Sequence, residues 1–267
     1  DVVRPGMLVF VREGTTLADT QWGCTSDATV IGTDNIVYAQ MTTAVGASAI
    51  TPAALNGSGF STFQEDFFLA SSGTLPPPLA KDVHNSATGD YVNDTAAGLY
   101  SLATAVTSEA ESAQLTFGNQ LVVDPTKAPI FEARVRINIP GATISADERW
   151  VVGLCSDHTN AEDALDAVVS NVWFRGEGAN LNIFIEGDDG TTDTDDTDST
   201  VDYVDNTYLV FKIDMTSLAA VKMFINGTQV VTTLNLAALS GSTVLQPIFC
   251  YQRDAGTEIN LLQVDWF

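Results

Sequence analysis

Residues 131–139 read Phe-Glu-Ala-Arg-Val-Arg-Ile-Asn-Ile, with an apolar residue at every odd position and a polar residue at every even position. Successive side chains of an extended strand point to opposite faces of a sheet. The alternation therefore predicts a strand with one face in a core and the other in water. Such half-buried strands are typical of antiparallel sheets.

The same pattern returns through the second half of the chain, at residues 181–185 and 209–215. A hairpin is predicted where Asn226-Gly227 separates residues 221–225 from 228–231, because this dipeptide favours a tight turn. The chain closes on apolar segments at 247–252 and 259–266. One short helix is predicted, with Asn160 as its N-cap and 164–169 as its body. Many strands joined by turns predict an all-β fold, an antiparallel β-sandwich over residues 61–267.

Residues 1–45 are organised differently. Short apolar segments at 5–11, 18–24, 29–31 and 36–41 are separated by turn residues, and we interpret them as a small N-terminal β module. Small and polar stretches follow, and we place a linker at 46–60. A module of this size cannot bury a large core by itself, so we expect it to pack against a partner or against neighbouring copies.

Composition argues against two classes of partner. The chain has 11 Lys and Arg against 34 Asp and Glu, a net charge of −23 at pH 7, so it lacks the basic stripe that binds nucleic acid. No segment approaches the roughly 20 apolar residues of a membrane span, and none resembles a signal peptide. The three distant cysteines Cys24, Cys155 and Cys250 favour reduced, buried thiols and folding in a cytosol. We expect no nucleic-acid partner and no membrane partner.

Two resemblances are carried by these segments. PGMLVFVREGTT, ADTQWGCT and IGTDNIVYAQ, in this order within residues 5–40, resemble a small β module of tailed-phage fibre proteins. The later segments resemble the concanavalin A-like (lectin or laminin-G type) jelly roll found in phage structural proteins. They are, in order, FEARVRI, VVGLCSD, SNVWFRGEGANLNIF, YLVFKIDM, VKMFINGTQV, LQPIFCYQ and INLLQVDWF.

Together the resemblances imply a surface protein of a bacteriophage virion, either a tail or head fibre or a capsid decoration, made in the host bacterial cytoplasm. They imply that the protein assembles through residues 1–45 with other capsid or tail proteins and displays the sandwich. They also imply a homo-oligomer, with a trimer as the expected state. The alternative function is a carbohydrate-binding adhesin that recognises host surface glycans, and the two functions are compatible.

The acidic run at residues 186–198 is the strongest candidate binding site. Oxygen ligands on a flexible segment suit Ca²⁺, and the candidate ligands are Asp193, Asp195, Asp196 and Asp198. The EF-hand template fails, because counting from Asp193 places Asp198 where Gly is needed and Val204 where Glu is needed. The alternative is a solvated loop between two strands that carries unpaired charge. Ca²⁺ is left open, and no other cofactor is expected.

We expect the protein not to be an enzyme. Hydrolases on this fold commonly carry Glu-x-Asp-x-x-Glu on one strand, whereas Glu186-Gly187-Asp188 is followed by Thr191 in place of the third acid. Neither Glu109 and Glu111 nor Glu65 and Asp66 fit the pattern. No Gly-x-Ser-x-Gly occurs, and we interpret Cys155 and His158 as a structural thiol beside a loop histidine.

Aromatic side chains are the remaining candidates for glycan contacts, since they stack on sugar rings. Trp173 and Trp266 fall within predicted strands, so core packing is expected for both. Trp150 stands at a strand entrance and is expected to be partly exposed. The sequence assigns no catalytic residue.

Overall fold

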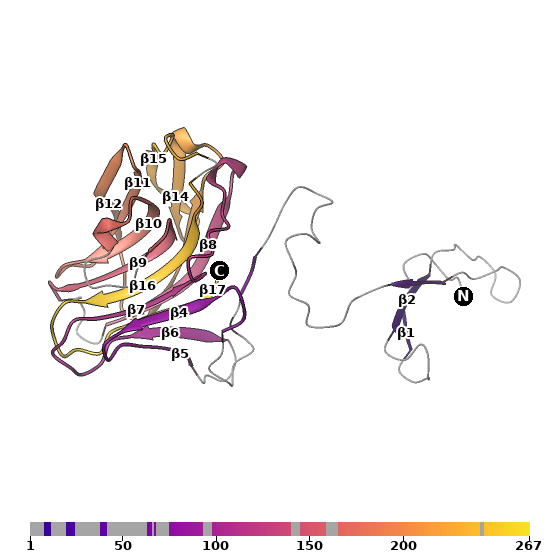
Figure 1. Ribbon diagram of the computed structural model, residues 1–267, viewed down its shortest axis with the longest axis horizontal. Helices are drawn as coiled ribbons and strands as arrows, with labels where there is room; N and C mark the ends of the chain where they lie inside the picture. Colours follow the sequence, from indigo (N-terminus) through magenta and orange to yellow (C-terminus); the bar gives the residue numbers. More distant parts are fainter. Residues whose placement is uncertain are drawn as a thin grey trace, which may run out of the picture. The chain divides into compact units, whose positions relative to one another are not determined.

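The computed structural model describes residues 8–11, 20–24, 38–41, 63–65, 67, 75–92, 98–139, 145–158, 165–240 and 243–267. The chain forms two compact units, residues 1–61 and residues 62–267. Both contain antiparallel sheets (Figure 1). Within the described ranges, no helix is long and apolar enough to cross a membrane.

The first unit contains a three-stranded antiparallel sheet. Its strands are β1 (Leu8–Val11), β2 (Thr20–Cys24) and β3 (Tyr38–Met41), and they pair in that order. Three of the four short strands predicted in this part of the sequence are therefore present. The strand predicted at 29–31 and the linker predicted at 46–60 lie outside the described residues.

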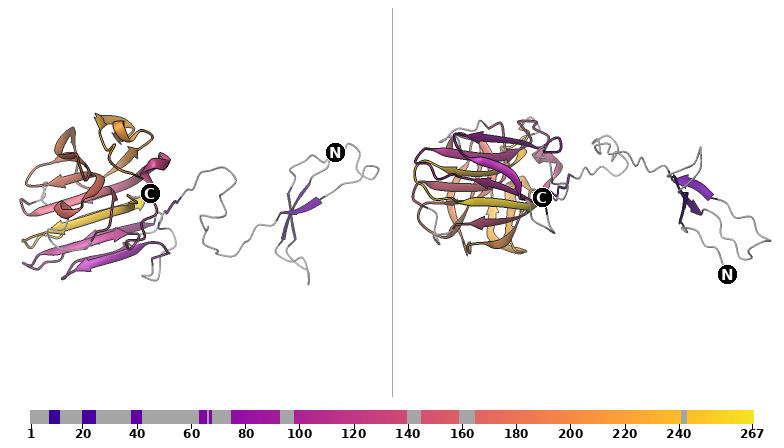
Figure 2. Two further views of the ribbon diagram at one scale, coloured as in Figure 1. Left: turned by 45° about the horizontal axis from the view of Figure 1, so that its top comes forward. Right: turned by 90° about the horizontal axis from the view of Figure 1, so that it is seen from below.

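The second unit is a sandwich of two seven-stranded antiparallel sheets, seen as two layers in Figure 2. Sheet I has the order β12-β11-β10-β9-β16-β7-β4. Its strands are β4 (Ala80–His84), β7 (Glu111–Thr116), β9 (Glu148–Cys155), β10 (Ser170–Glu177), β11 (Asn182–Asp189), β12 (Asp193–Asp202) and β16 (Gln246–Arg253).

Sheet II has the order β15-β14-β13-β8-β17-β6-β5. Its strands are β5 (Thr88–Val92), β6 (Leu99–Ala103), β8 (Ile130–Asn138), β13 (Thr207–Asp214), β14 (Val221–Ile225), β15 (Thr228–Leu234) and β17 (Leu261–Trp266). Neighbouring strands are often distant in sequence, as expected for a jelly roll. The predicted antiparallel jelly-roll sandwich is confirmed.

Strand β8 lies in the middle of sheet II, between β13 and β17. Phe131, Ala133, Val135 and Ile137 are all buried, while the residues between them are exposed or half-buried. The alternation in the sequence therefore reports the two faces of this strand correctly. The predicted Asn226-Gly227 hairpin joins β14 to β15, and both turn residues have positive φ (51° and 80°), the conformation that this dipeptide favours.

Two buried tryptophans pack on opposite faces of sheet I, each across from a glycine. Trp150 is paired with Gly176, and Trp173 with Gly153. A Cβ on Gly176 would lie 2.2 Å from Trp150 Nε1, so only glycine leaves room for that ring. Trp150 faces the core and stacks on Phe211, with ring centroids 5.9 Å apart. The expectation that Trp150 is partly exposed is wrong, because the missing side chain at Gly176 lets the ring lie flat inside the sandwich.

The predicted helix at 160–169 is described only in its second half, where Leu165–Ala167 form a short 3₁₀ turn. Residues 159–164, including the predicted N-cap, lie outside the described part of the chain. The described residues also form 3₁₀ turns at Pro125–Lys127 and Leu218–Ala220.

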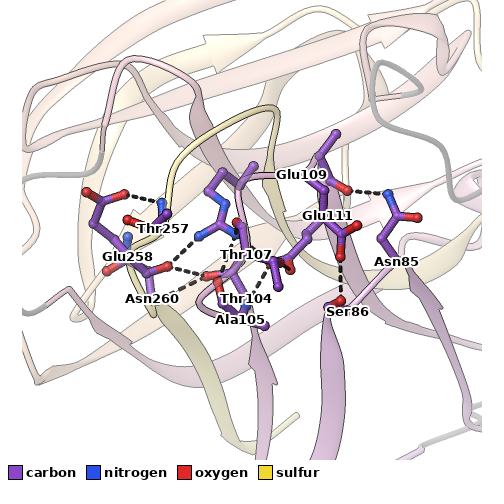
Figure 3. A network of polar contacts seen from close by, with 12 residues as sticks. Asn85, Ser86, Thr104, Ala105, Thr107, Glu109, Glu111, Thr257, Glu258 and Asn260 are labelled. Carbon is purple, nitrogen blue, oxygen red and sulfur yellow. Dashed lines mark hydrogen bonds and ion pairs between the residues drawn. The ribbon is translucent and has the colours of Figure 1, made fainter.

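A buried polar network ties several segments together at one end of the sandwich (Figure 3). Arg253 on β16 and Glu111 on β7 form an ion pair at 2.8 Å, and both side chains are fully buried. The Arg253 guanidinium also donates to the backbone carbonyl oxygens of Ala105 and Thr107, at 2.9 and 2.7 Å, and to that of Glu258. Glu111 accepts from the Ala105 N–H at 2.7 Å. The network therefore fixes the connection between β6 and β7.

The network continues toward the start of β9. Asn260 donates from its backbone N–H to Thr104 Oγ1 at 3.1 Å and from Nδ2 to Glu148 Oε1 at 2.6 Å. The other oxygen of Glu148 accepts the Ser145 N–H at 2.7 Å. Glu148 is thereby held at the first position of β9.

Candidate functional site

The acidic run at residues 186–198 belongs to the β11–β12 hairpin at the edge of sheet I. Residues 186–189 end β11, residues 190–192 make the turn, and Asp193 begins β12. The run is therefore a loop only at the turn, but Asp193, Asp195, Asp196 and Asp198 are exposed, as the alternative interpretation of a solvated run predicts. Pairing with β11 holds these acidic residues in register, although Asp is a poor strand former.

The register of this hairpin brings carboxylates together. Asp188 lies directly opposite Asp193, a like-charge pair that is unfavourable by itself. Gly187 pairs with Thr194 and Ile185 with Thr197, so a β-bulge places both Asp195 and Asp196 opposite Glu186.

The bulge has a backbone signature. Asp196 has a positive φ of 43°, which is uncommon for a residue with a side chain. Because of this extra residue, two carboxylates lie opposite Glu186, where a regular strand would place one residue.

Other acidic side chains of the run stabilise the hairpin backbone. Asp188 Oδ1 accepts the Gly190 N–H at 2.7 Å. Asp189 accepts the N–H groups of Thr191, Thr192 and Ala238, at 3.0, 2.7 and 2.9 Å. Burial opposes ionisation of Asp189, but these N–H groups outweigh it and lower the pKa of its carboxyl.

Asp198 has a comparable structural role. Its Oδ1 accepts the Thr200 N–H at 2.7 Å, and its Oδ2 lies 3.4 Å from Asn182 Nδ2. Of the four candidate calcium ligands, the structure groups Asp193, Asp195 and Asp196 along one surface groove, whereas Asp198 does not line that groove.

This groove has a volume of about 480 Å³ and lies on sheet I, over β9 to β12. Its acidic lining from the hairpin is Glu186, Asp188, Asp193, Asp195 and Asp196. Asn171 and Arg175 of β10 and Arg149 of β9 also line it. The volume is in the range of small-molecule sites in proteins.

Arg175 is the more buried of the two arginines that line the groove. It is 7% exposed, and its Nη1 lies 3.0 Å from Glu186 Oε2, while its Nη2 pairs with Glu177. Burial raises the pKa of Glu186. Arg175 and Trp173 oppose the rise and Asp195 adds to it, so burial outweighs the paired cation.

The hairpin carboxylates also act on one another. Loss of hydration, followed by repulsion from Asp195 and Asp188, raises the pKa of Asp193. Crowded carboxylates of this kind are more easily protonated than isolated ones.

Asn171 contributes a buried acceptor to the groove. It is 2% exposed, its Nδ2 donates to the Val168 carbonyl at 3.3 Å, and its Oδ1 has no hydrogen-bond partner in the described structure. Asn171 is paired across the strands with Asp188. Because a buried acceptor without a donor is costly, a ligand that donates a hydrogen bond here would be favoured.

A second hydrophobic cluster covers part of sheet I beside the groove. Its members, all buried, are Val151, Cys155, Leu165, Val168, Trp173, Ile248 and Cys250. The segment from Leu165 to Val168 lies over Trp173, so this indole is not available for stacking on a sugar. Phe184 of β11 is half-buried. It lies two residues before Glu186 in the same strand, so both side chains point to the face of sheet I that carries the groove.

The described residues contain no group of three or more His, Cys, Asp or Glu side chains that could hold a metal ion. The carboxylates are spread along the groove and do not converge on one point. The arrangement suits a ligand with several hydrogen-bond donors better than a single cation.

The residues weighed for catalysis in the sequence occupy separate places in the described structure. Thr191, at the position of the missing third acid, falls in the hairpin turn beyond the end of β11. Glu111 is held by Arg253, and Asp66 lies outside the described residues. Burial raises the pKa of the Cys155 thiol and lowers the pKa of His158, which keeps the thiol protonated and the imidazole neutral.

Sequence reasoning missed Asn171 and Arg175. The segment 170–177 alternates, with Asn171, Trp173, Arg175 and Glu177 on one face, and this alternation was the available signal. It could not show that this face meets the acidic hairpin, because the meeting depends on the pairing of β10 with β11.

No protein-family model and no curated protein matches the sequence. Among solved structures, a protein of unknown function from Shewanella oneidensis MR-1 is similar, with a TM-score of 0.51 and 15% identity over 83% of this chain and 94% of that one. A family 16 glycoside hydrolase of a Bacteroides ovatus mixed-linkage glucan locus, in complex with an oligosaccharide product, is similar with a TM-score of 0.51 and 10% identity, over 76% of this chain and 98% of that one. A family 16 endo-glucanase from the same species is similar with a TM-score of 0.50 and 8% identity, over 76% of this chain and 98% of that one. These similarities show a shared jelly-roll fold.

Proposed function

We propose that residues 62–267 form a carbohydrate-binding domain whose binding surface is the groove on sheet I. The observation that carries the proposal is the unsatisfied, buried acceptor Asn171 Oδ1 within a row of carboxylate and guanidinium groups. Sugar hydroxyls donate and accept hydrogen bonds at close spacing, so they match such a lining. The Bacteroides ovatus hydrolase with a bound oligosaccharide product supports saccharide binding as a function that this fold can carry.

The proposed activity is binding and not cleavage. Hydrolysis requires two carboxyl groups on either side of the scissile bond, one of them free to donate a proton. Glu186 is engaged by Arg175 at 3.0 Å, and the third acidic position is Thr191 in the turn. Release of reducing ends from any glycan that binds would contradict this part of the proposal.

Phe184 is the proposed stacking surface beside the groove. It pairs with Arg175 on β10 and with Asp198 on β12, so a ring laid on Phe184 would extend from the carboxylate row. Aromatic contacts are worth about 0.5–1.5 kcal/mol.

Glycan-array binding followed by titration calorimetry tests the site. Asn171→Ala and Phe184→Ala should each weaken the best glycan by about tenfold, or about 1.4 kcal/mol. Phe224→Ala is the matched control, since Phe224 is a half-buried aromatic on β14 of the other sheet. Equal losses from Phe184→Ala and Phe224→Ala, or no glycan bound by the wild-type chain, would refute the proposal.

We also propose that the domain is displayed on a bacteriophage particle, as a tail fibre, head fibre or capsid decoration attached through the N-terminal β module. The support is the resemblance of residues 5–40 to phage fibre modules and the three-stranded sheet formed by β1, β2 and β3. The proposed assembly is a homotrimer bound to other virion proteins.

Deleting residues 1–45 tests the attachment. The truncated chain should bind the same glycans, yet behave as a monomer in light scattering and be missing from purified particles. Normal assembly of the truncated chain would refute the role assigned to the module. Locating the full chain in images of the intact particle would separate head from tail.

A further inference from the structure

The groove has a strong excess of negative charge. Seven carboxylates line it, from Glu148, Glu177 and the five acidic residues of the hairpin, against the two guanidinium groups of Arg149 and Arg175. A groove that only recognised neutral sugars would need a few carboxylates as acceptors. The excess therefore calls for an explanation in terms of the ligand.

The two guanidinium groups already have carboxylate partners. Arg175 pairs with Glu177 and Glu186, and Arg149 pairs with Asp254. Within the described ranges, no Lys or Arg forms an ion pair with Asp188, Asp193, Asp195 or Asp196. The row along the hairpin is thus the uncompensated part of the groove.

The backbone geometry concentrates this charge. Asp188 and Asp193 face each other as a cross-strand pair, and the bulge sets Asp195 and Asp196 against Glu186. Like charges directly opposite one another destabilise a sheet, and the left-handed backbone at Asp196 adds strain. Unfavourable features of this kind collect at binding sites, where a ligand relieves them.

An independent observation points to a ligand that donates hydrogen bonds. Asn171 lines the same groove, across from Asp188, and its Oδ1 is buried without a partner. An ammonium group supplies both a positive charge and N–H donors, whereas a bare metal ion needs several ligands that converge on one point. The described residues offer no such convergent group.

We propose that the groove recognises aminated saccharides, that is, glycans whose sugar residues carry free, protonated amino groups. This inference rests on the proposed carbohydrate-binding function and names its ligand class. The ammonium groups lie along Asp188, Asp193 and Asp195, and the sugar hydroxyls reach Asn171 and Arg175.

The experiment compares two ligands of equal length, one with protonated amino groups and one in which acetyl groups remove that charge. Calorimetric titration of the full chain with glucosamine oligosaccharides, and with the fully N-acetylated oligosaccharides of equal length, is carried out at mildly acidic pH, where the amines are protonated. The charged ligand should bind at least about tenfold more tightly than its acetylated form. Added salt should reduce the difference, because the attraction is partly screened.

Matched variants place the effect in the groove. Asp193→Asn with Asp195→Asn should remove most of the preference for the charged ligand, and Asp193→Lys with Asp195→Lys should abolish binding of that ligand. Asp202→Asn with Glu132→Gln is the control, because it neutralises two exposed carboxylates that do not line the groove. Thermal unfolding of each variant shows whether it remains folded.

Each outcome decides a different question. Equal binding of the charged and acetylated ligands overturns this inference and leaves the proposed function standing. Failure of every saccharide to bind overturns both. An equal loss in the groove variants and in the control pair means that net charge alone attracts the ligand, which overturns the site. Competition by CaCl₂ at concentrations too low to act by screening would reassign the carboxylates to a cation.

Discussion

Arg253→Met should destabilise the sandwich strongly, because it removes the cation at the centre of the buried network at one end of the fold. Arg253 and Glu111 are both fully buried, and their ion pair measures 2.8 Å. Removing one partner of a buried ion pair costs about 3–5 kcal/mol, since the other charge is left uncompensated. A domain of this size loses about 2–4 °C of melting temperature for each kcal/mol, so we expect a fall of about 6–20 °C.

The assay is thermal unfolding of the full chain, followed by the fluorescence of the buried Trp150 and Trp173. Lys81→Met is the matched control, because it removes an ion pair with Asp90 of 3.3 Å whose side chains are 39% and 65% exposed. Exposed pairs contribute about 0–1 kcal/mol, so the control should change little. If Arg253→Met lowers the melting temperature no more than Lys81→Met does, the network does not stabilise the fold as argued.

Three further changes test other parts of the structure. Gly176→Ala should cost about 1–3 kcal/mol in thermal unfolding, because its Cβ would lie 2.2 Å from Trp150 Nε1, and a wild-type melting curve would contradict the packing described. In a Cys24→Ser variant, the native protein should not react with a thiol reagent at mildly alkaline pH, because burial raises the pKa of Cys155 and raises that of Cys250 to about 12. Rapid labelling of either thiol before unfolding would contradict their burial. Burial raises the pKa of Glu186 above its ordinary value of 4.5. Trp173 and Arg175 lower this pKa, and Asp195 raises it further, but burial is the largest effect. Protonation of Glu186 therefore stabilises the folded state. This contribution to the free energy of unfolding is present below pH 4.5 and is lost as pH rises through the pKa of Glu186 in the folded state. Denaturant unfolding should therefore show that the wild type loses stability relative to Glu186→Gln over this pH interval. A stability difference that does not change with pH would refute the prediction.

The sandwich could be predicted from the sequence because its main signals are local. The alternation at 131–139 needs only a neighbouring core to become β8, and Asn226-Gly227 selects its turn through its own φ preferences. Both features were predicted correctly because no distant residue competes with them.

The features that escaped prediction depend on pairing between strands. Trp150 is buried because Gly176 lies opposite it on β10, a relation that spacing along the chain does not reveal. The acidic run becomes a strand because β11 supplies its hydrogen-bonding partner, and this pairing outweighs the low strand propensity of Asp. Asn171 reaches the carboxylates through the same register.

Protection of a sheet edge explains only part of the acidic hairpin. β12 is an edge strand of sheet I, and charges and bulges on such strands prevent association with other sheets. That role is met by charge of either sign on β12, and it requires nothing of the interior strand β11. Glu186 and Asp188 nevertheless stand on β11, where burial penalises Glu186 and Asp193 repels Asp188. Carboxylates placed at an energetic cost on an interior strand favour the role of a ligand site over edge protection. The Asp193→Lys and Asp195→Lys substitutions separate the two roles, because they keep the edge strand charged while reversing the sign of that charge in the groove.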